Sequence, residues 1–184
     1  MFKKSLILGV TALSMVATSA IAADVSRVRL MVPVQASDAA SYEAGETKPD
    51  SVSASGYNLQ YVHSSGVGVG YTSTSYKSEF SGGSYDEFQD ATFVDLSYTF
   101  GSEMTGQIAV GMLTGHGSIA SGSDTYTVGD KSGSAFAITG GYDFGGFEAL
   151  LGYRSETVKA KIEGGTTEYD VSRTLINAGL GFTF

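Results

Sequence analysis

The chain has 184 residues and a formal net charge of −8, with 25 glycines, two prolines and neither cysteine nor tryptophan. This length fits a single domain. The lack of cysteine excludes disulfides, zinc–thiolate sites and thiol chemistry. The acidic balance argues against a nucleic-acid partner, because nucleic-acid binding needs a basic surface.

The first 22 residues have the organisation of a cleaved secretory signal peptide. Lys3 and Lys4 form a positive start, an apolar stretch covers 5–16, and Ala20-Ile21-Ala22 is a small-x-small cleavage site. We therefore expect a mature chain of residues 23–184 with a net charge of −10, since the two lysines are removed. The alternative is an uncleaved anchor, but the apolar stretch is short and is followed by hydroxyl residues.

Eight segments of the remaining chain alternate apolar and polar residues with the period of two that β-strands have. They cover about 25–35, 53–63, 67–74, 91–100, 105–116, 134–144, 147–156 and 175–184. In the last segment Ile176, Ala178, Leu180, Phe182 and Phe184 form a continuously apolar face. Because every segment repeats this pattern, few other apolar residues remain to pack against these faces. We therefore expect the apolar faces to contact lipid. Strands can span lipid only in a closed barrel, where every backbone group is paired.

The connections between these segments alternate in length. Short ones lie at 64–66, 101–104 and 145–146, and long ones at 37–51, 77–90, 117–133 and 158–170. Outer-membrane barrels show this asymmetry, with short periplasmic turns and longer extracellular loops. An even number of strands places both chain ends on the periplasmic side.

Together these features resemble the small eight-stranded bacterial outer-membrane β-barrels, the type that includes OmpX and the OmpA transmembrane domain. The terminal residues Leu180, Phe182 and Phe184 resemble the signature that the barrel-assembly machinery reads. The resemblance implies an all-β, eight-stranded antiparallel up-and-down transmembrane β-barrel in the outer membrane of a Gram-negative bacterium. It implies a monomer surrounded by outer-membrane lipid and lipopolysaccharide, and it does not pick out one functional family.

The inward-facing positions of the predicted strands collect four positive and four negative side chains. These are Arg27, Arg29, Asp95, Asp143, Glu148, Arg154, Glu156 and Arg173. Eight strands enclose a space that side chains can fill, and charges there must be paired, because unpaired burial is costly. The sequence therefore predicts an interior ion-pair network that plugs the barrel. A narrow polar pathway or a gate is the alternative.

Candidate chemistry outside the barrel interior is sparse. His63 and Ser65 resemble the His-x-Ser pair of outer-membrane lipid A deacylases, but they fall in a short turn, on the side opposite the outer-leaflet substrate. The acidic loops fit a solvated surface, and weak divalent-cation bridging to lipopolysaccharide phosphates is an alternative interpretation. The sequence thus predicts no catalytic, cofactor or metal site.

These observations favour a non-enzymatic outer-membrane protein with a structural or surface-interaction role, displaying acidic extracellular loops. Two other functions stay open. The small inward residues of the third and fifth segments are compatible with a narrow channel or lateral conduit for small or hydrophobic solutes. The His63–Ser65 pair leaves a lipid A-modifying enzyme as the third possibility.

Overall fold

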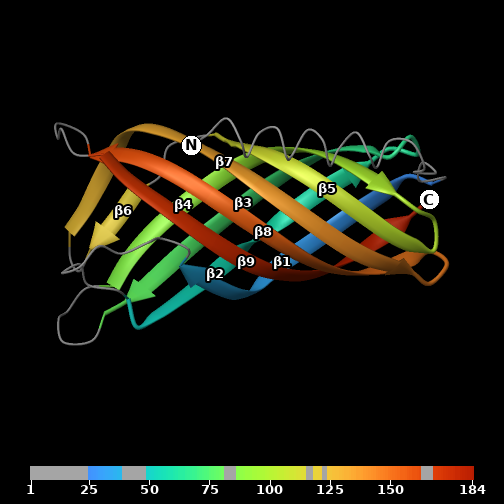
Figure 1. Ribbon diagram of the computed structural model, residues 1–184, viewed down its shortest axis with the longest axis horizontal. Coiled ribbons are helices and arrows are strands. Elements are labelled where there is room, and N and C mark those ends of the chain that lie inside the picture. The colour runs from blue at the N-terminus through green and yellow to red at the C-terminus, as the bar shows by residue number, and fades with distance from the viewer. Residues whose placement is uncertain (1–24, 39–48, 81–85, 115–117, 122–123, 163–167) are drawn as a thin grey trace, which may run out of the picture.

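The computed structural model describes residues 25–38, 49–80, 86–114, 118–121, 124–162 and 168–184. The predicted signal peptide lies outside these residues. Figure 1 shows an elongated barrel of long, tilted strands, with the C-terminus and the short turns at one end. The strands are β1 (Arg27–Asp38), β2 (Ser51–Val62), β3 (Val67–Glu79), β4 (Asp86–Phe100), β5 (Met104–Leu113), β6 (Ser118–Ser121), β7 (Asp124–Asp143), β8 (Phe147–Ile162) and β9 (Glu168–Thr183).

Eight of these strands form the barrel wall. Their order is β3-β2-β1-β9-β8-β7-β5-β4, all neighbours are antiparallel, and β4 pairs back onto β3 to close the sheet. The short β6 follows β5 in the same sheet and pairs with the same two neighbours, β4 and β7, on the long-loop side. The predicted closed, eight-stranded antiparallel barrel is therefore confirmed. Within the described residues, no helix is long and apolar enough to cross a membrane.

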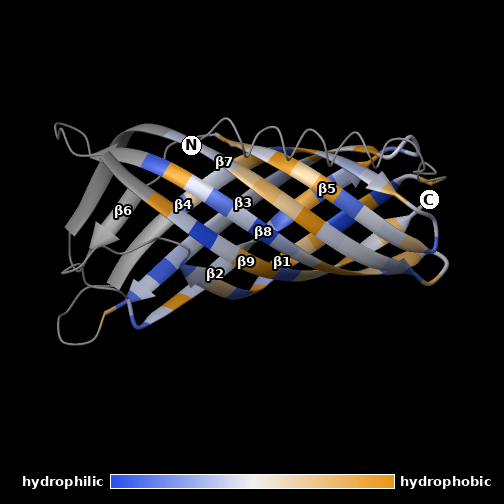
Figure 2. Cartoon of the chain, in the orientation of Figure 1, coloured by the Kyte–Doolittle hydropathy of each residue, from blue (hydrophilic) through white to orange (hydrophobic). Residues whose placement is uncertain are grey.

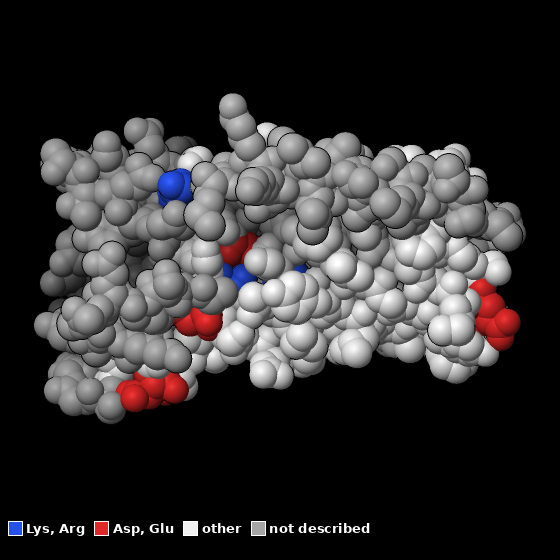
Figure 3. Space-filling model, in the orientation of Figure 1, with Lys and Arg blue, Asp and Glu red and all other residues white. Residues whose placement is uncertain are grey.

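The alternation of the sequence becomes an outer and an inner face. Apolar side chains point outward along every wall strand; Leu30, Leu96 and Leu151, for example, are about half exposed. Figure 2 shows apolar and polar residues alternating along the strands. The visible face in Figure 3 carries a broad band without charged side chains toward the short-turn end. The outward apolar residues form a belt around the barrel, which on β9 extends over 176–184. At ~3.3 Å per residue and a ~40° tilt, this apolar belt is roughly 23 Å tall, close to the apolar band of a membrane barrel.

The short connections are tight turns in which glycine is required. In the β2–β3 turn the Gly66 amide donates to the His63 carbonyl at 2.8 Å, and Gly66 has a φ of 86°. Gly101, between β4 and β5, has the same φ. A side chain at such a φ is strained, so these glycines fix the positions at which neighbouring strands reverse.

The strands on the long-loop side continue further than the sequence pattern predicts. β7 begins at Asp124 rather than near 134, β4 begins at Asp86 rather than near 91, and β8 continues to Ile162. A membrane-spanning strand needs only ~9–11 residues, so these strands extend well beyond the apolar belt. The predicted strands ended too early because the pattern is reversed there: outward positions such as Ser75 and Thr92 are polar, whereas inward positions such as Tyr76 are apolar.

Candidate functional site

The lower interior, next to the short turns, is built around one ion pair. Arg29 of β1 donates from Nε to Glu148 Oε2 at 2.8 Å and from Nη2 to Glu148 Oε1 at 2.7 Å. The same guanidinium reaches the Thr99 hydroxyl at 3.1 Å and the Thr105 hydroxyl at 3.3 Å. Both charged side chains are fully buried. This bidentate geometry is the strong form of an arginine–carboxylate contact.

A second ion-pair layer lies above the first. Asp95 of β4 accepts from the Arg154 guanidinium at 3.0 and 3.1 Å, from Asn58 at 3.0 Å and from the Thr72 hydroxyl at 2.6 Å. Arg154 also donates to Glu156 through its Nε atom. Asp95 and Arg154 are at most 2 % exposed. Each buried charge therefore has an opposite charge and further hydrogen-bond partners.

Small inward residues make room for both layers. A Cβ atom on Gly111 would lie 2.2 Å from Asp95 Oδ1, and one on Gly181 would lie 2.9 Å from Glu148 Oε2. A larger side chain at either position would collide with a carboxylate that is already fixed by its partners. The glycine-rich inner face of β5 and β9 is therefore filled by the charged side chains of other strands.

An apolar layer completes the upper interior. Tyr76, Phe93 and Leu175 are buried together with Ala91 and Ala135. The layer is joined to the charges beneath it, because the Tyr76 hydroxyl bonds Glu156 and the Phe93 ring lies 5.0 Å from the Arg154 guanidinium carbon. Tyr76 was not among the predicted inward residues, because the predicted third strand ends near residue 74. Extending the inward positions by one step, from Thr74 to residue 76, would have found it.

All eight charged residues predicted to face inward lie inside the barrel or at its mouth. Arg173 has Asp38 and Glu156 as its cross-strand neighbours on β1 and β8, and its guanidinium carbon lies 4.0 Å from the Tyr76 ring centroid. The order of Asp38, Arg173, Glu156 and then Arg154 alternates in sign. The interior charges of β1, β8 and β9 therefore lie side by side as a connected group rather than as isolated pairs.

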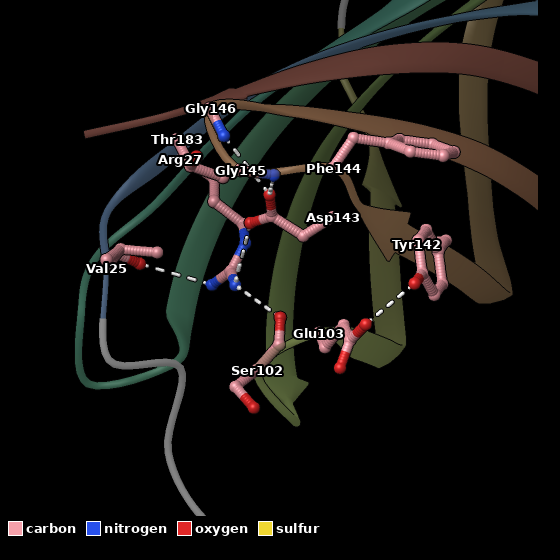
Figure 4. A pocket seen from close by; sticks show the side chains of 10 residues that line it. All are labelled: Val25, Arg27, Ser102, Glu103, Tyr142, Asp143, Phe144, Gly145, Gly146 and Thr183. Atoms are coloured by element: carbon pink, nitrogen blue, oxygen red, sulfur yellow. Dashed lines mark hydrogen bonds and ion pairs between the residues drawn. The ribbon is translucent and has the colours of Figure 1, made fainter.

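The short-turn end of the barrel opens as a cup of about 700 Å³ with Arg27 in its lining (Figure 4). Arg27 donates to the backbone carbonyls of Val25 at 3.2 Å and Ser102 at 3.3 Å. Its nitrogens lie 3.9 Å from both Asp143 and Glu148. Asp143 Oδ1 also accepts the amides of Gly145 and Gly146, at 2.8 and 3.3 Å. Asp143 is therefore shared between the interior charges and the turn.

The three C-terminal residues of the predicted assembly signature face outward. Leu180, Phe182 and Phe184 are 54 %, 63 % and 70 % exposed. The backbone of Phe184 exchanges two 3.0 Å hydrogen bonds with Ser26, just before β1. The last residue thus extends the β1–β9 pairing by one step at the short-turn end.

The ladder between β1 and β2 is much shorter than its neighbours. These strands are in register only from Arg27↔Val62 to Met31↔Asn58, whereas β2 pairs with β3 as far as Ser51 and β1 pairs with β9 as far as Asp38. Pro33, which has no N–H to donate, and a β-bulge between residues 33 and 35 lie where the ladder stops. We call the stretch between 32–38 and 51–57 the β1–β2 seam.

The His63–Ser65 pair is a local feature of the β2–β3 turn. His63 Nδ1 lies 3.0 Å from the Ser65 hydroxyl and accepts the Ser65 amide at 3.1 Å. Both residues are exposed, and they are only two positions apart in the chain. These hydrogen bonds therefore stabilise the turn. Among the described residues, no group of three or more His, Cys, Asp or Glu side chains is arranged to hold a metal ion.

Comparison with known proteins identifies the architecture. No protein-family model matches the sequence, and no curated protein matches it. The structure is similar to that of Neisserial surface protein A, with a TM-score of 0.52 and 14 % identity over 89 % of this chain and 99 % of that one. It is also similar to E. coli outer membrane protein W, with a TM-score of 0.50 and 13 % identity over 89 % and 99 %. The chain therefore has the fold of the small eight-stranded bacterial outer-membrane β-barrels.

Proposed function

We propose that the protein is an integral outer-membrane barrel with a closed lumen that acts through its outer surface and its extracellular end. The observation that carries this proposal is the filled interior. The Arg29–Glu148 pair, the Asp95–Arg154–Glu156 cluster and the Tyr76–Phe93–Leu175 layer follow one another along the lumen. Eight strands leave an interior only wide enough for such side chains. This arrangement supports a structural or surface-interaction role in the envelope.

The proposal includes the route to the membrane and the surroundings there. Residues 1–22 act as the export signal and are removed, and the barrel-assembly machinery recognises Leu180, Phe182 and Phe184. The mature barrel is a monomer in contact with outer-membrane lipid and lipopolysaccharide. The uncharged outward band supports this setting, because an apolar surface of this extent needs a lipid or protein cover.

Two measurements test this proposal. The outer-membrane fraction should contain the protein as a heat-modifiable species that changes gel mobility on boiling. The purified barrel in planar bilayers should give no steady conductance. Soluble extraction without a mobility shift would contradict the membrane location, whereas a persistent open conductance would contradict the closed lumen.

The β1–β2 seam favours a second candidate function, lateral access of apolar molecules to the upper interior. Ala36 of β1 and Ala54 of β2, on the two sides of the seam, pack against the buried apolar layer. A molecule entering there would meet Tyr76 and Leu175 without crossing the charged layers below. In this view the ion pairs close the periplasmic side while the seam opens sideways.

Dye binding separates the two candidate functions. Ala54→Phe narrows the seam side of the apolar layer, and Leu151→Phe, on the exposed lipid-facing surface of β8, is the matched control. Lateral access predicts that Ala54→Phe weakens binding of an apolar fluorescent dye to the detergent-solubilised barrel, while the control does not. Equal dye binding by both variants would exclude this route.

We assign no enzymatic role to His63 and Ser65. The hydrogen bonds of the His63 ring are both to Ser65 within the turn, and among the described residues no carboxylate pairs with His63. Expression of the wild-type protein and of His63→Ala should leave the mass of lipid A unchanged. A mass change that depends on His63 would establish the catalytic alternative.

A further inference from the structure

Three amide side chains line the interior between the two ion-pair layers. Asn58 and Gln60 point inward from β2 and Gln107 from β5, and their exposed fractions are 6 %, 4 % and 1 %. Asn58 contacts the upper layer, because its Nδ2 donates to Asp95 at 3.0 Å. Gln107 contacts the lower layer, because its Nε2 donates at 3.0 Å to the Thr99 hydroxyl, which also binds the arginine of the lower pair. We call the three amides the amide site.

Glycines on β3 let the surrounding side chains converge at the amide site. Gln60 lies opposite Gly70. A Cβ atom on Gly70 would lie 2.9 Å from Gln60 Cγ, and one on Gly68 would lie 2.6 Å from the Ser97 hydroxyl oxygen. Gln60 from β2 and Ser97 from β4 therefore extend over the inner face of β3. Ser97 connects this group to Gln107, whose Nε2 lies 3.3 Å from the same hydroxyl.

The carbonyl oxygen of each amide has no hydrogen-bond partner among the described residues. These atoms are Asn58 Oδ1, Gln60 Oε1 and Gln107 Oε1. The Asn58 amide is fixed in this orientation, because its nitrogen faces the carboxylate of Asp95, which accepts only. A buried acceptor without a partner costs stability, and native interiors contain few of them. Three such atoms in one part of the lumen indicate a bound species that donates hydrogen bonds.

The charges around the amide site select a neutral occupant. Arg29 is paired with Glu148 and Arg154 with Asp95, so the neighbouring carboxylates are already neutralised. A cation would add positive charge between two buried guanidinium groups, which is costly. An anion would face carbonyl oxygens, which only accept. Water is neutral, donates two hydrogen bonds and can accept one from a hydroxyl such as that of Ser97.

We propose that the amide site binds ordered water molecules that join the two ion-pair layers. A buried water makes ~2–4 hydrogen bonds to protein groups, and the three amide oxygens with the neighbouring hydroxyls supply partners of this kind. The plug of the lumen then consists of protein and water, so a lumen closed to ions is not a dry one. This inference goes beyond the proposed function and does not depend on the outer-membrane location.

Oxygen-17 relaxation dispersion tests the amide site on the folded barrel in detergent micelles, because it detects water that stays bound for longer than the barrel tumbles. The test variant is Gln60→Met, which keeps the length of the side chain and removes its amide. Leu175→Met is the matched control, because it introduces a methionine of similar volume at an inward position that is also buried, in the apolar layer. The gel mobility shift shows whether each variant is folded.

The wild-type barrel should show a dispersion from long-lived water. Gln60→Met should lose part of this dispersion and unfold at a lower urea concentration, because the bound water loses an acceptor, whereas Leu175→Met should keep the wild-type dispersion. A dry site predicts the opposite change in stability, since removing an unpartnered buried oxygen relieves its desolvation cost. Absence of long-lived water in the wild type, which needs no variant to establish, would overturn the proposal. An unchanged dispersion or a raised urea midpoint in Gln60→Met, or an equal loss of dispersion in Leu175→Met, would overturn it as well.

Discussion

Removal of the Glu148 carboxylate is the most direct test of the lower ion-pair layer. In Glu148→Ala, Arg29 loses two hydrogen bonds of 2.7 and 2.8 Å and keeps only the hydroxyls of Thr99 and Thr105. Arg27, 3.9 Å from the same carboxylate, loses a second favourable charge. The variant therefore leaves two buried guanidinium groups, of which Arg27 still lies 3.9 Å from Asp143.

The expected loss in the free energy of unfolding follows from the cost of leaving a buried charge without its partner, which is ~3–5 kcal/mol. We expect Glu148→Ala to lower the free energy of unfolding by about 4–5 kcal/mol. Asp95→Ala should cost less, about 3 kcal/mol, because Arg154 retains its contact with Glu156. Replacing the whole lower pair, as Arg29→Met with Glu148→Leu, should stay within ~2 kcal/mol of wild type, since apolar replacements of buried pairs are often tolerated.

Urea-induced unfolding of the barrel in detergent or lipid vesicles measures these differences. The chain has no tryptophan, so far-UV circular dichroism and gel mobility report the transition. Glu79→Ala is the control, because this carboxylate is exposed and solvent screens its ion pair with Lys77, so the pair is expected to contribute little to stability. If Glu148→Ala unfolds within 1 kcal/mol of wild type, or no more easily than Glu79→Ala, the lower pair does not hold the interior as argued.

Three further perturbations address other parts of the barrel. Arg27→Ala should destabilise it by roughly 2 kcal/mol, because charge-assisted hydrogen bonds to two carbonyls are lost; an unchanged urea midpoint would contradict this role. Deletion of Phe184 should lower the amount of heat-modifiable protein in the outer membrane and increase periplasmic degradation, since both the proposed assembly signature and a backbone pair with Ser26 are lost; normal insertion would count against the signature. Gly111→Leu should displace Asp95 and lower the unfolding midpoint, with Gly140→Leu, whose added Cβ meets no atom within 4 Å, as the unaffected comparison.

The two faces of each wall strand could be predicted because side-chain direction in a strand is a local property. Successive residues point to opposite sides whatever the strand pairs with. Val28 and Leu30 are exposed while Arg27 and Arg29 are buried, as their alternation indicates. The same rule placed Asp95 and Arg154 inside without knowledge of their neighbours.

Strand ends and the upper interior could not be predicted in the same way. Above the outward apolar belt the pattern is reversed, with polar residues outward and apolar residues inward, and β7 was expected to begin about ten residues later than it does. Tyr76 lies beyond the predicted end of the third segment, and β6 lies within the predicted loop 117–133. The gap in the β1–β2 ladder depends on the partners of both strands, and Pro33 alone does not specify it.

The sequence by itself determined the number of wall strands, their inward and outward faces and the set of charges that face the lumen, because these follow from a period of two along the chain. The tertiary structure decided which charges meet. Arg29 and Glu148 are 119 residues apart, and Asp95 and Arg154 are 59 apart. Their contacts are set by the register of every intervening strand pair and by closure of the sheet, and these are properties of the whole barrel.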